Sequence, residues 1–429
     1  LACAQLITDQ EEAVTKTKPF TIDKWQVVRA YELVKANAGA AGIDQQSIAD
    51  FDKNRKNNLY KLWNRLSSGS YCPAPVKAVA IPKKSGGERI LGIPSVSDRI
   101  AQMVVKMAFE PKVEPHFLPD SYGYRPGKSA LDAIGITRKR CWSYNWVLEF
   151  DIKGLFDNIP HELLLKAVDK HQPTAWIRLY IQRWLTAPMV MPDGEVRART
   201  QGTPQGGVIS PLLANLFMHY VFEKWLQQHY PNIPWCRYAD DGLVHCRSES
   251  EAKHMLEVLR ERFIACGLEL HPEKTKIVYC KDGSRKGNYE HTSFDFLGYT
   301  FRRRVVKNRK RNSLFVSFTP AVSKVALKAM RRKIKVLKVR SRTELNIAQL
   351  GGWLNPIING WIGYYGRYNR SALYSLFRHI NKALIRWARR KYKTLRRHKT
   401  RTLKFLEGIA TKSPRLFAHW RAGMVGRFS

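Results

Sequence analysis

Two adjacent aspartates stand between short apolar runs in Trp235-Cys-Arg-Tyr-Ala-Asp-Asp-Gly-Leu-Val-His245. The pattern predicts a strand, a tight turn and a second strand, with Asp240 and Asp241 at the tip of a hairpin. Neighbouring carboxylates repel each other, so the pair destabilises the fold unless a cation such as a divalent metal neutralises it. Taken alone, the pair is also compatible with an ordinary surface turn.

A third acid closes another apolar run, Val147-Leu-Glu-Phe-Asp151, which is typical of a short strand. If this strand pairs beside the hairpin, Asp151 lies next to Asp240. Three carboxylates form an all-oxygen site, which suits Mg²⁺. Two such ions can activate a 3′-hydroxyl and stabilise a leaving pyrophosphate. The three acids therefore predict two-metal nucleotidyl transfer.

Charge is the outlier of the composition, since 74 Lys and Arg face 35 Asp and Glu for a net +39. The excess is uneven, because residues 302–429 hold 34 of the bases and only two acids, Glu344 and Glu407. Such an excess favours a polyanionic partner, since each neutralised phosphate releases counterions. The same third is rich in large apolar residues, so we expect a folded nucleic-acid-binding domain there.

The 429 residues, of which 44% are hydrophobic, suffice for two or three domains with sizeable cores. Seven scattered cysteines without a C-x-x-C pair argue against a zinc site and for reduced thiols. No apolar run approaches the roughly 20 residues that span a bilayer, and the first residues lack a signal-peptide pattern. We expect a cytoplasmic protein, in a bacterial-type cytosol or associated with the nucleoid, without a membrane partner.

The order of elements is helices, a β-hairpin, an α+β core and then helices alone. Helical spacing is expected at 24–66, 97–110, 130–142, 161–186, 211–225, 249–266 and from 320 to the end. Strands are expected within 74–95 and at 147–151, 235–238, 243–244, 275–279 and 294–301.

Three motifs stand in one order along the chain: Phe150-Asp-Ile-Lys-Gly-Leu-Phe-Asp157, Gln201-Gly-Thr-Pro-Gln-Gly-Gly-Val-Ile-Ser-Pro211 and Tyr238-Ala-Asp-Asp241. In this order they resemble the palm of reverse transcriptases. Further stretches make the chain similar to group II intron-encoded reverse transcriptase–maturases over about residues 20–400. These stretches are Ile81–Arg89, Gly92–Gln102, Ser121–Gly127, Leu268–Thr275 and Phe296–Tyr299.

The resemblance implies that Asp151, Asp240 and Asp241 are the catalytic residues and bind two Mg²⁺ ions, with the backbone of Ile152 as a further ligand. Deoxynucleoside triphosphates would be the substrates. Phe156, five residues after Asp151, would be the bulky gate that rejects a ribose 2′-hydroxyl. By itself, a phenylalanine at this position is more often a core aromatic.

Other positions of the family site are implied in the same way. Leu297 and Gly298 would lie near the primer end. Two glycines after Gln205 would let the backbone approach the nucleotide or template. The residues expected to bind the nucleotide through polar side chains are Lys83, Arg89, Gln205 and Lys274.

The basic last third is similar to the thumb, or maturase, domain through which this family binds intron RNA and assists splicing. Basic residues anchor phosphates, and interleaved aromatics can stack on unpaired bases. We expect Trp353 and Trp361 to pack between helices instead. The residues expected to bind RNA are Lys324, Lys328, Arg331, Arg332, Lys335, Arg386, Arg389 and Arg390.

The predicted fold is α+β, a right-hand polymerase with fingers and palm followed by an all-α thumb or maturase domain. The expected domains are an N-terminal helical extension at 1–75, fingers and palm at 76–305, the thumb at 320–395 and a short basic tail at 396–429. Many members add a Cys-rich H-N-H endonuclease, whereas this sequence has no cysteine after Cys280 and stops at Ser429. We therefore expect no endonuclease of its own and priming from a pre-existing DNA strand.

The predicted function is that of an RNA-directed DNA polymerase and splicing maturase of a mobile group II intron. Its partners would be the intron RNA, in a ribonucleoprotein, and target DNA with its primer strand. A CRISPR-associated or diversity-generating reverse transcriptase is an alternative within the same superfamily. A splicing-only maturase is disfavoured by the intact acids, and a non-catalytic ribosomal-type RNA binder by the three ordered motifs.

Overall fold

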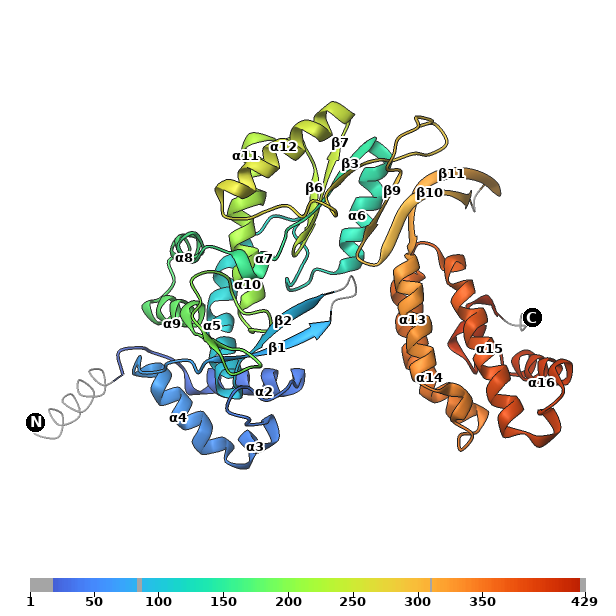
Figure 1. The fold of residues 1–429 in the computed structure, drawn as a ribbon, viewed down its shortest axis with the longest axis horizontal. Coiled ribbons are helices and arrows are strands. Elements are labelled where there is room, and N and C mark those ends of the chain that lie inside the picture. The colour runs from blue at the N-terminus through green and yellow to red at the C-terminus, as the bar shows by residue number, and fades with distance from the viewer. Residues whose placement is uncertain (1–17, 83–86, 309–310, 425–429) are drawn as a thin grey trace, which may run out of the picture. The chain divides into compact units, whose positions relative to one another are not determined.

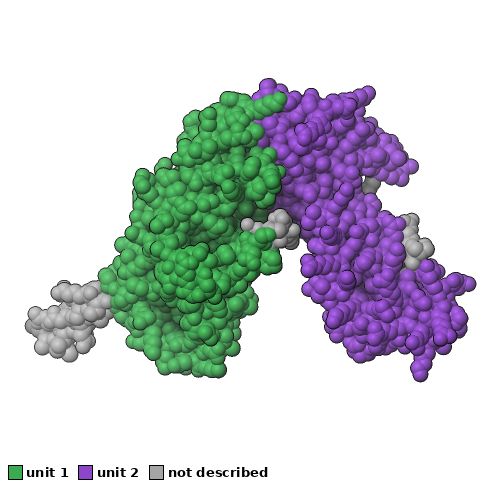
Figure 2. All heavy atoms as spheres, viewed as in Figure 1, with its two compact units in different colours: residues 1–129, 150–244, 253–275 green, residues 130–149, 245–252, 276–429 purple. Residues whose placement is uncertain are grey.

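The computed structural model describes residues 18–82, 87–308 and 311–424, and the chain divides into two compact units (Figure 2). Unit 1 comprises residues 1–129, 150–244 and 253–275, and unit 2 comprises residues 130–149, 245–252 and 276–429. Each unit is thus assembled from several chain segments. Three elements, which are β3, β7 and α12, begin in one unit and end in the other.

The described part of unit 1 begins with three helices, α2 (Lys24–Asn37), α3 (Ile48–Lys53) and α4 (Arg55–Ser67) (Figure 1). Helix α3 starts at a capping box, in which Ser47 and Asp50 each accept the backbone N–H of the other. Helix α2 packs against α5 (Val96–Val113), whose apolar face is buried.

The first sheet of unit 1 has the strand order β2-β1-β4-β5. Its strands are β1 (Val76–Pro82), β2 (Glu88–Ile93), β4 (Met189–Val190) and β5 (Val196–Arg197). Strands β1 and β2 form the predicted hairpin, with Lys77 opposite Ile93 and Pro82 opposite Glu88. This register places Arg89 near the turn end of β2.

The helices of the α+β core surround the palm motifs. The segment 161–186, expected as one helical stretch, forms two helices, because Gln172 adopts a positive φ of 46° and Pro173 follows it. The helices of this region are α7 (Leu155–Asn158), α8 (His161–Asp169), α9 (Ala175–Thr186), α10 (Ser210–Met218), the π-helical turn η2 (His219–Glu223), α11 (Lys224–His229) and α12 (Glu249–Ala265).

A second sheet has the strand order β6-β7-β3-β8. Its strands are β3 (Trp146–Asp151), β6 (Trp235–Tyr238), β7 (Asp241–Cys246) and β8 (Lys276–Tyr279). Strands β6 and β7 are antiparallel, and so are β3 and β8. The predicted Asp-Asp hairpin and the strand that ends in Asp151 therefore belong to one sheet.

In unit 2, α6 (Ala130–Ser143) packs against a three-stranded sheet, β11-β10-β9. The strands are β9 (Ser293–Phe296), β10 (Tyr299–Asn308) and β11 (Ser313–Val322). The prediction of a single strand at 294–301 was wrong, because Leu297 and Gly298 both have positive φ and turn the chain back. The long β10–β11 hairpin was not predicted at all.

The described residues of unit 2 from Lys324 onward are mainly helical and form an apolar core of their own. Trp353 and Trp361 pack against this core, as expected. Residues 399–424, within the segment expected as a basic tail, contribute buried side chains such as Leu406 and Trp420 to it. The helices of this part of unit 2 are α13 (Lys324–Val336), α14 (Ile347–Tyr365), α15 (Tyr374–Lys391) and α16 (Lys399–Lys412). Short helical turns accompany them: η3 (Val339–Ser341), η4 (Arg370–Leu373), η5 (Lys393–Leu395) and η6 (Trp420–Met424). Unit 1 has one such turn after α5, η1 (Glu114–His116). None of the described helices is long and apolar enough to cross a membrane.

Candidate active site

The two hairpin aspartates stand at a two-residue turn between β6 and β7. Tyr238 pairs with Asp241, so Ala239 and Asp240 form the connection. Ala239 is buried and left-handed, with φ of 57°. An L-residue in this conformation costs about 1–2 kcal/mol, so the surrounding contacts must hold the turn in place.

Asp151 lies beside this turn. The Ile152 N–H donates to the Asp240 carbonyl oxygen at 3.4 Å, which joins the end of β3 to the turn. Phe150 packs so closely on Gly242 that a Cβ there would lie 2.1 Å from its ring. The structure therefore brings together the chain segments that carry the three predicted acids, although they are far apart in sequence.

The Asp240 carboxyl group is electrostatically strained. Burial raises its pKa, and the negative charge of Asp151 raises it further, while Arg89 and Lys274 act in the opposite direction. The net pKa is above the ordinary value for an aspartate. A divalent cation would relieve this repulsion, so the oxygen-only donor set fits a magnesium-type ion.

The carboxylates are not gathered into a ready coordination shell. Within residues 18–82, 87–308 and 311–424, no three His, Cys, Asp or Glu side chains form a group that could hold a metal ion. Asp151 instead accepts a hydrogen bond from the Lys274 ammonium group at 3.0 Å. Ligation of a metal by Asp151, Ile152, Asp240 and Asp241 stays a prediction.

The segment that carries Lys274 is fixed to the end of β3. The His271 N–H donates to the Asp151 carbonyl oxygen at 2.8 Å, and Lys153 N–H donates to the Glu269 carbonyl oxygen at 2.9 Å. Lys274 is thereby held at the Asp151 carboxylate, and its predicted role in nucleotide binding stays a prediction.

Two of the predicted nucleotide-binding residues contact each other. Arg89 Nε donates to Gln205 Oε1, and Gln205 Nε2 donates to Asp157 Oδ2 at 2.8 Å. Gly206, with φ of 125°, sits where a Cβ would lie 2.5 Å from the Gly92 carbonyl oxygen. The glycine-rich loop is thus pinned between β2 and α7. Lys83, predicted to bind the triphosphate with Arg89, lies outside the described residues.

Phe156 is buried on α7, with 8% of its surface exposed. Its ring meets the ring of Tyr124 edge-on, with 6.4 Å between the centroids. Tyr124 is 52% exposed and left-handed, and burial together with the charge of Asp240 raises the pKa of its hydroxyl. Tyr124 therefore lies close to both the acids and the predicted sugar gate.

A cavity of about 610 Å³ in unit 1 reaches this group of residues. Its lining includes Tyr124, Gln205, Arg99, Lys106 and residues 38–40 and 92–94. Arg99 does not face it as a free charge, because its guanidinium donates to the carbonyl oxygens of Ala38 and Ala40. The cavity offers a largely uncharged wall beside the Arg89–Gln205 contact.

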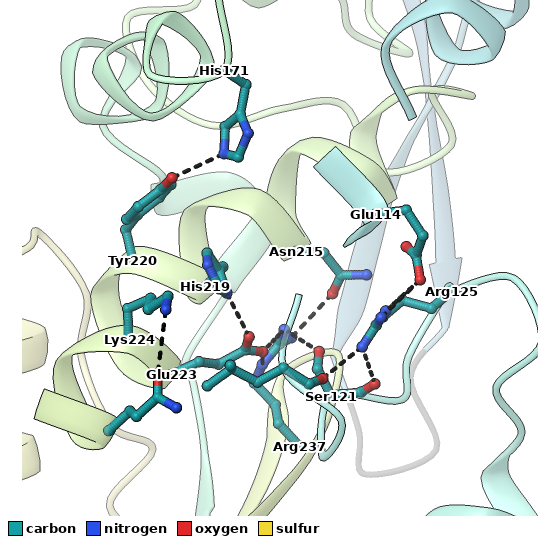
Figure 3. Close-up of polar contacts among 12 residues, drawn as sticks. Glu114, Ser121, Arg125, His171, Asn215, His219, Tyr220, Glu223, Lys224 and Arg237 are labelled. Atoms are coloured by element: carbon teal, nitrogen blue, oxygen red, sulfur yellow. Dashed lines mark hydrogen bonds and ion pairs between the residues drawn. The ribbon is translucent and has the colours of Figure 1, made fainter. Parts of the chain in front are cut away.

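Sequence reasoning missed the polar network around Arg237 (Figure 3), which contacts the turn through the Ala239 carbonyl oxygen. Arg237, between apolar neighbours in β6, is fully buried and bonds to Ser121, Asn215 and Glu223. A charged residue within an apolar strand next to the Asp-Asp pair was the available signal. Tyr124 was missed as well, although its loop contributed to the family resemblance.

Leu297 and Gly298 lie in unit 2, at the turn between β9 and β10. The Tyr364 hydroxyl donates to the Leu297 carbonyl oxygen at 2.9 Å, and a Cβ on Gly298 would lie 2.9 Å from the Tyr365 hydroxyl. The turn is thus packed against α14. Its predicted place near the primer end stays a prediction.

The predicted RNA-binding residues of unit 2 differ in how free their charges are. Arg331 donates to Ser375 Oγ at 3.0 Å, and Arg389 donates to the Arg396 carbonyl oxygen, so both are half-buried and used within the fold. The other six are exposed: Lys324, Lys328, Arg332, Lys335, Arg386 and Arg390. A helical repeat of 3.6 residues places the four on α13 along one stripe, opposite the buried Met330 and Ile334.

The close contact between Gly242 and Phe150 gives a first testable expectation. Gly242→Ala should destabilise the protein by about 1–3 kcal/mol, because an added methyl group must displace the ring or the hairpin, and it should also slow the reaction of the site. Thermal unfolding and activity would be measured together. Gly352→Ala is the matched control, since no atom lies within 4 Å of its Cβ position. Equal behaviour of the two variants would contradict the contact.

A hairpin with two aspartates beside a third at the end of a neighbouring strand, framed by basic and amide side chains, defines a template-directed nucleic-acid polymerase. The family model described as "Reverse transcriptase (RNA-dependent DNA polymerase)" matches residues 81–301, more than half of the chain. The model "Group II intron, maturase-specific domain" matches residues 327–405. The chain belongs to the reverse transcriptase family and carries a group II intron maturase domain, which confirms the predicted resemblance, fold class and enzyme class.

Individual relatives agree with this assignment. "Protein YkfC" of Escherichia coli is 33% identical over 65% of this chain and 79% of its own length. "Group II intron-encoded protein LtrA" of Lactococcus lactis is 33% identical over 46% of this chain and 33% of its own length. A solved telomerase from Candida albicans aligns with a TM-score of 0.44 and 13% identity over 82% of this chain and 65% of that chain, a likeness too weak to argue from. The chain thus spans most of the first relative and about a third of the second.

Proposed function

We propose that this chain copies RNA into DNA at a site formed by Asp151, Asp240 and Asp241. The observation that carries the proposal is the hydrogen bond between Ile152 N–H and the Asp240 carbonyl oxygen, because it holds the three acid-bearing segments together. The raised pKa of Asp240 supports it, since clustered, repelling carboxylates are typical of a site that receives cations.

Two Mg²⁺ ions, bound by the three aspartates and the Ile152 backbone, would activate the primer 3′-hydroxyl and stabilise the leaving pyrophosphate. The protein's own groups supply positioning. Arg89, held by Gln205, would bind the triphosphate of a deoxynucleotide, and Lys274 would keep positive charge next to Asp151. Lys83 completes this proposed set from sequence alone.

In unit 2, we assign RNA binding to the exposed bases of α13 and α15. An RNA partner follows from the maturase domain, whereas its identity as the host intron, and splicing assistance, are part of the proposal. Target DNA as primer, and intron mobility by target-primed reverse transcription, remain predictions of the same kind. A cytoplasmic location is proposed from the sequence alone, in which seven cysteines are scattered without a C-x-x-C pair.

The proposed activity is tested by extension of a DNA primer on an RNA template with deoxynucleotides and Mg²⁺. Extension that stops without Mg²⁺ supports the proposal. No extension by folded protein that still binds RNA would leave a splicing-only maturase. Sequencing the RNA that co-purifies with the protein tests the partner, because a bound lariat intron is expected.

The proposed gate makes a separate prediction. Phe156→Ala should lower the preference for deoxynucleotides over ribonucleotides by about 10–200-fold, because a lost steric contact is worth about 1–3 kcal/mol. The ratio of kcat/KM for the two nucleotides measures it. Phe156→Tyr keeps the bulk and should keep the preference. If Phe156 only fills the core, the alanine variant will lose stability while its selectivity stays as in the wild type.

A further inference from the structure

A fully buried arginine lies directly under the catalytic turn. Arg237, on β6, is two residues before Ala239 and has no exposed surface. Its guanidinium has five N–H donors, and all five are used. The acceptors lie on four residues: the Ala239 carbonyl oxygen at 2.9 Å, Asn215 Oδ1 at 3.1 Å, Ser121 Oγ at 2.8 Å, and Glu223 Oε1 twice, once from Nε at 3.0 Å.

The bond to the Ala239 carbonyl oxygen is the one that concerns catalysis. This carbonyl belongs to the peptide unit that leads into Asp240. Because Ala239 is in the left-handed region, the direction of this peptide is unusual and needs an external partner. The guanidinium supplies that partner from inside the protein.

The charge of Arg237 is balanced by Glu223, which is also fully buried. Burial raises the pKa of Glu223, but the charge of Arg237 and the hydrogen bond with His219 lower it, and the net pKa lies below the ordinary value. His219 Nδ1 lies 3.0 Å from the second carboxylate oxygen. The carboxylate is therefore ionised and held from both sides, and it fixes the guanidinium in turn.

The same network holds the loop that presents Tyr124. The backbone N–H of Arg237 donates to the Asp120 carbonyl oxygen at 3.0 Å, and the backbone N–H of Tyr122 donates to the Arg237 carbonyl oxygen at 2.9 Å. Asn215 Nδ2 donates to the Gly123 carbonyl oxygen at 2.6 Å. A Cβ on Gly123 would lie 2.5 Å from the Ala239 nitrogen, so the loop closes directly over the turn.

We propose that Arg237 is a positioning residue for nucleotidyl transfer, which holds the Ala239–Asp240 peptide so that Asp240 faces Asp151, with Glu223 as its buried counter-ion. The inference rests on the proposed polymerase site and adds the group that aims one of its acids. Arg237 itself touches no substrate. Its effect should therefore appear in the catalytic step and in the Mg²⁺ requirement, not in nucleotide or RNA binding.

Arg237→Lys keeps the positive charge but has at most three donors, which cannot reach four residues. We expect kcat for primer extension to fall about 100-fold, the cost typical of a misplaced reacting group, with the KM for deoxynucleotide and the affinity for RNA little changed. The Mg²⁺ concentration for half-maximal activity should rise. Ser121→Ala, which removes one acceptor, should lower kcat several-fold with the same unchanged KM.

The matched control is Arg285→Lys. Arg285 also bonds to a carboxylate, Asp282, and to the carbonyl oxygens of Cys141 and Tyr144, but to no part of the turn. Its substitution should lower Tm and leave kcat and the Mg²⁺ requirement unchanged. Equal losses of kcat in the two lysine variants at equal loss of Tm would overturn the inference. If Arg237→Lys does not fold, Ser121→Ala provides the test. A wild-type kcat and a wild-type Mg²⁺ requirement in Ser121→Ala would then overturn the inference.

The outcomes separate this inference from the proposed function. If wild-type protein cannot extend a primer, the proposed polymerase function is wrong. If wild-type protein extends normally and the Arg237→Lys variant has the same kcat, only the positioning role of Arg237 is wrong.

Discussion

Asp240→Asn is expected to abolish primer extension, by at least about 10³-fold, while RNA binding stays near the wild-type level. The substitution keeps the size of the side chain but removes a negative charge that the metal ions need. The exposed bases of α13 and α15 are not altered by it. Extension rates with Mg²⁺ and filter-binding affinities for RNA measure the two effects separately.

Asp193→Asn serves as the control, because it removes the same charge from an exposed turn residue of unit 1. It should extend primers normally. Equal loss of RNA binding and extension in Asp240→Asn would show that the two activities are not separable.

Asp240→Asn should also stabilise the protein when a chelator removes divalent ions. The folded-state pKa of Asp240 is raised, so the folded protein holds this proton more tightly than the unfolded chain does. Stability from this group is therefore present at low pH and is lost as the pH rises through the raised pKa. Above the raised pKa the carboxylate is charged and the penalty applies; asparagine carries no charge, so Tm should rise at a pH above that pKa. An unchanged Tm in chelator would contradict the strain assigned to this carboxylate.

Removing the basic stripe of α13 should weaken RNA binding more than any other change in unit 2. The quadruple variant replaces the four exposed bases by alanine: Lys324, Lys328, Arg332 and Lys335. Each phosphate contact contributes about 0.7–0.9 to the slope of log affinity against log salt concentration. Loss of four contacts should reduce that slope by about 3 and the affinity by about 10²-fold or more. Extension of a short primer on an unrelated template should persist.

A second quadruple variant tests whether the stripe or only the total charge matters. Alanine at four exposed bases of α16 removes the same charge from the same unit: Lys399, Arg401, Lys404 and Lys412. We expect a smaller loss of affinity from this variant. If both variants lose the same affinity, RNA recognition is spread over the unit and the α13 stripe has no special role.

The acids were predictable because Asp151 ends a short apolar strand, and Asp240 and Asp241 stand at the turn between two others. Pairing of such strands brings residues together that are far apart in sequence. Arg89, Gln205 and Lys274 were predicted through the family resemblance, and the structure places them around Asp151 and Asp157. Their proposed roles still await the experiments above.

Tertiary contacts and unusual backbone conformations could not be predicted from the sequence. The role of Arg237 depends on its hydrogen-bond partners Ser121, Asn215 and Glu223, and the sequence of its own strand does not identify these partners. The β9–β10 turn was read as continuous strand, because Leu297 gives no sign of its positive φ. Arg331 and Arg389 were predicted to bind RNA, and only the folded helices show that they also make hydrogen bonds within the protein.

The interleaved order of the two units limits how this enzyme can be shortened. A truncation after the polymerase motifs, near residue 305, would keep α6 but discard β11, the strand against which α6 packs. Trp142 would lose its hydrogen-bond acceptor, the Phe318 carbonyl oxygen. A minimal cDNA-synthesis reagent should therefore retain the chain at least through Val322, and a split version should be divided at a surface turn such as 191–194 in preference to a boundary between motifs.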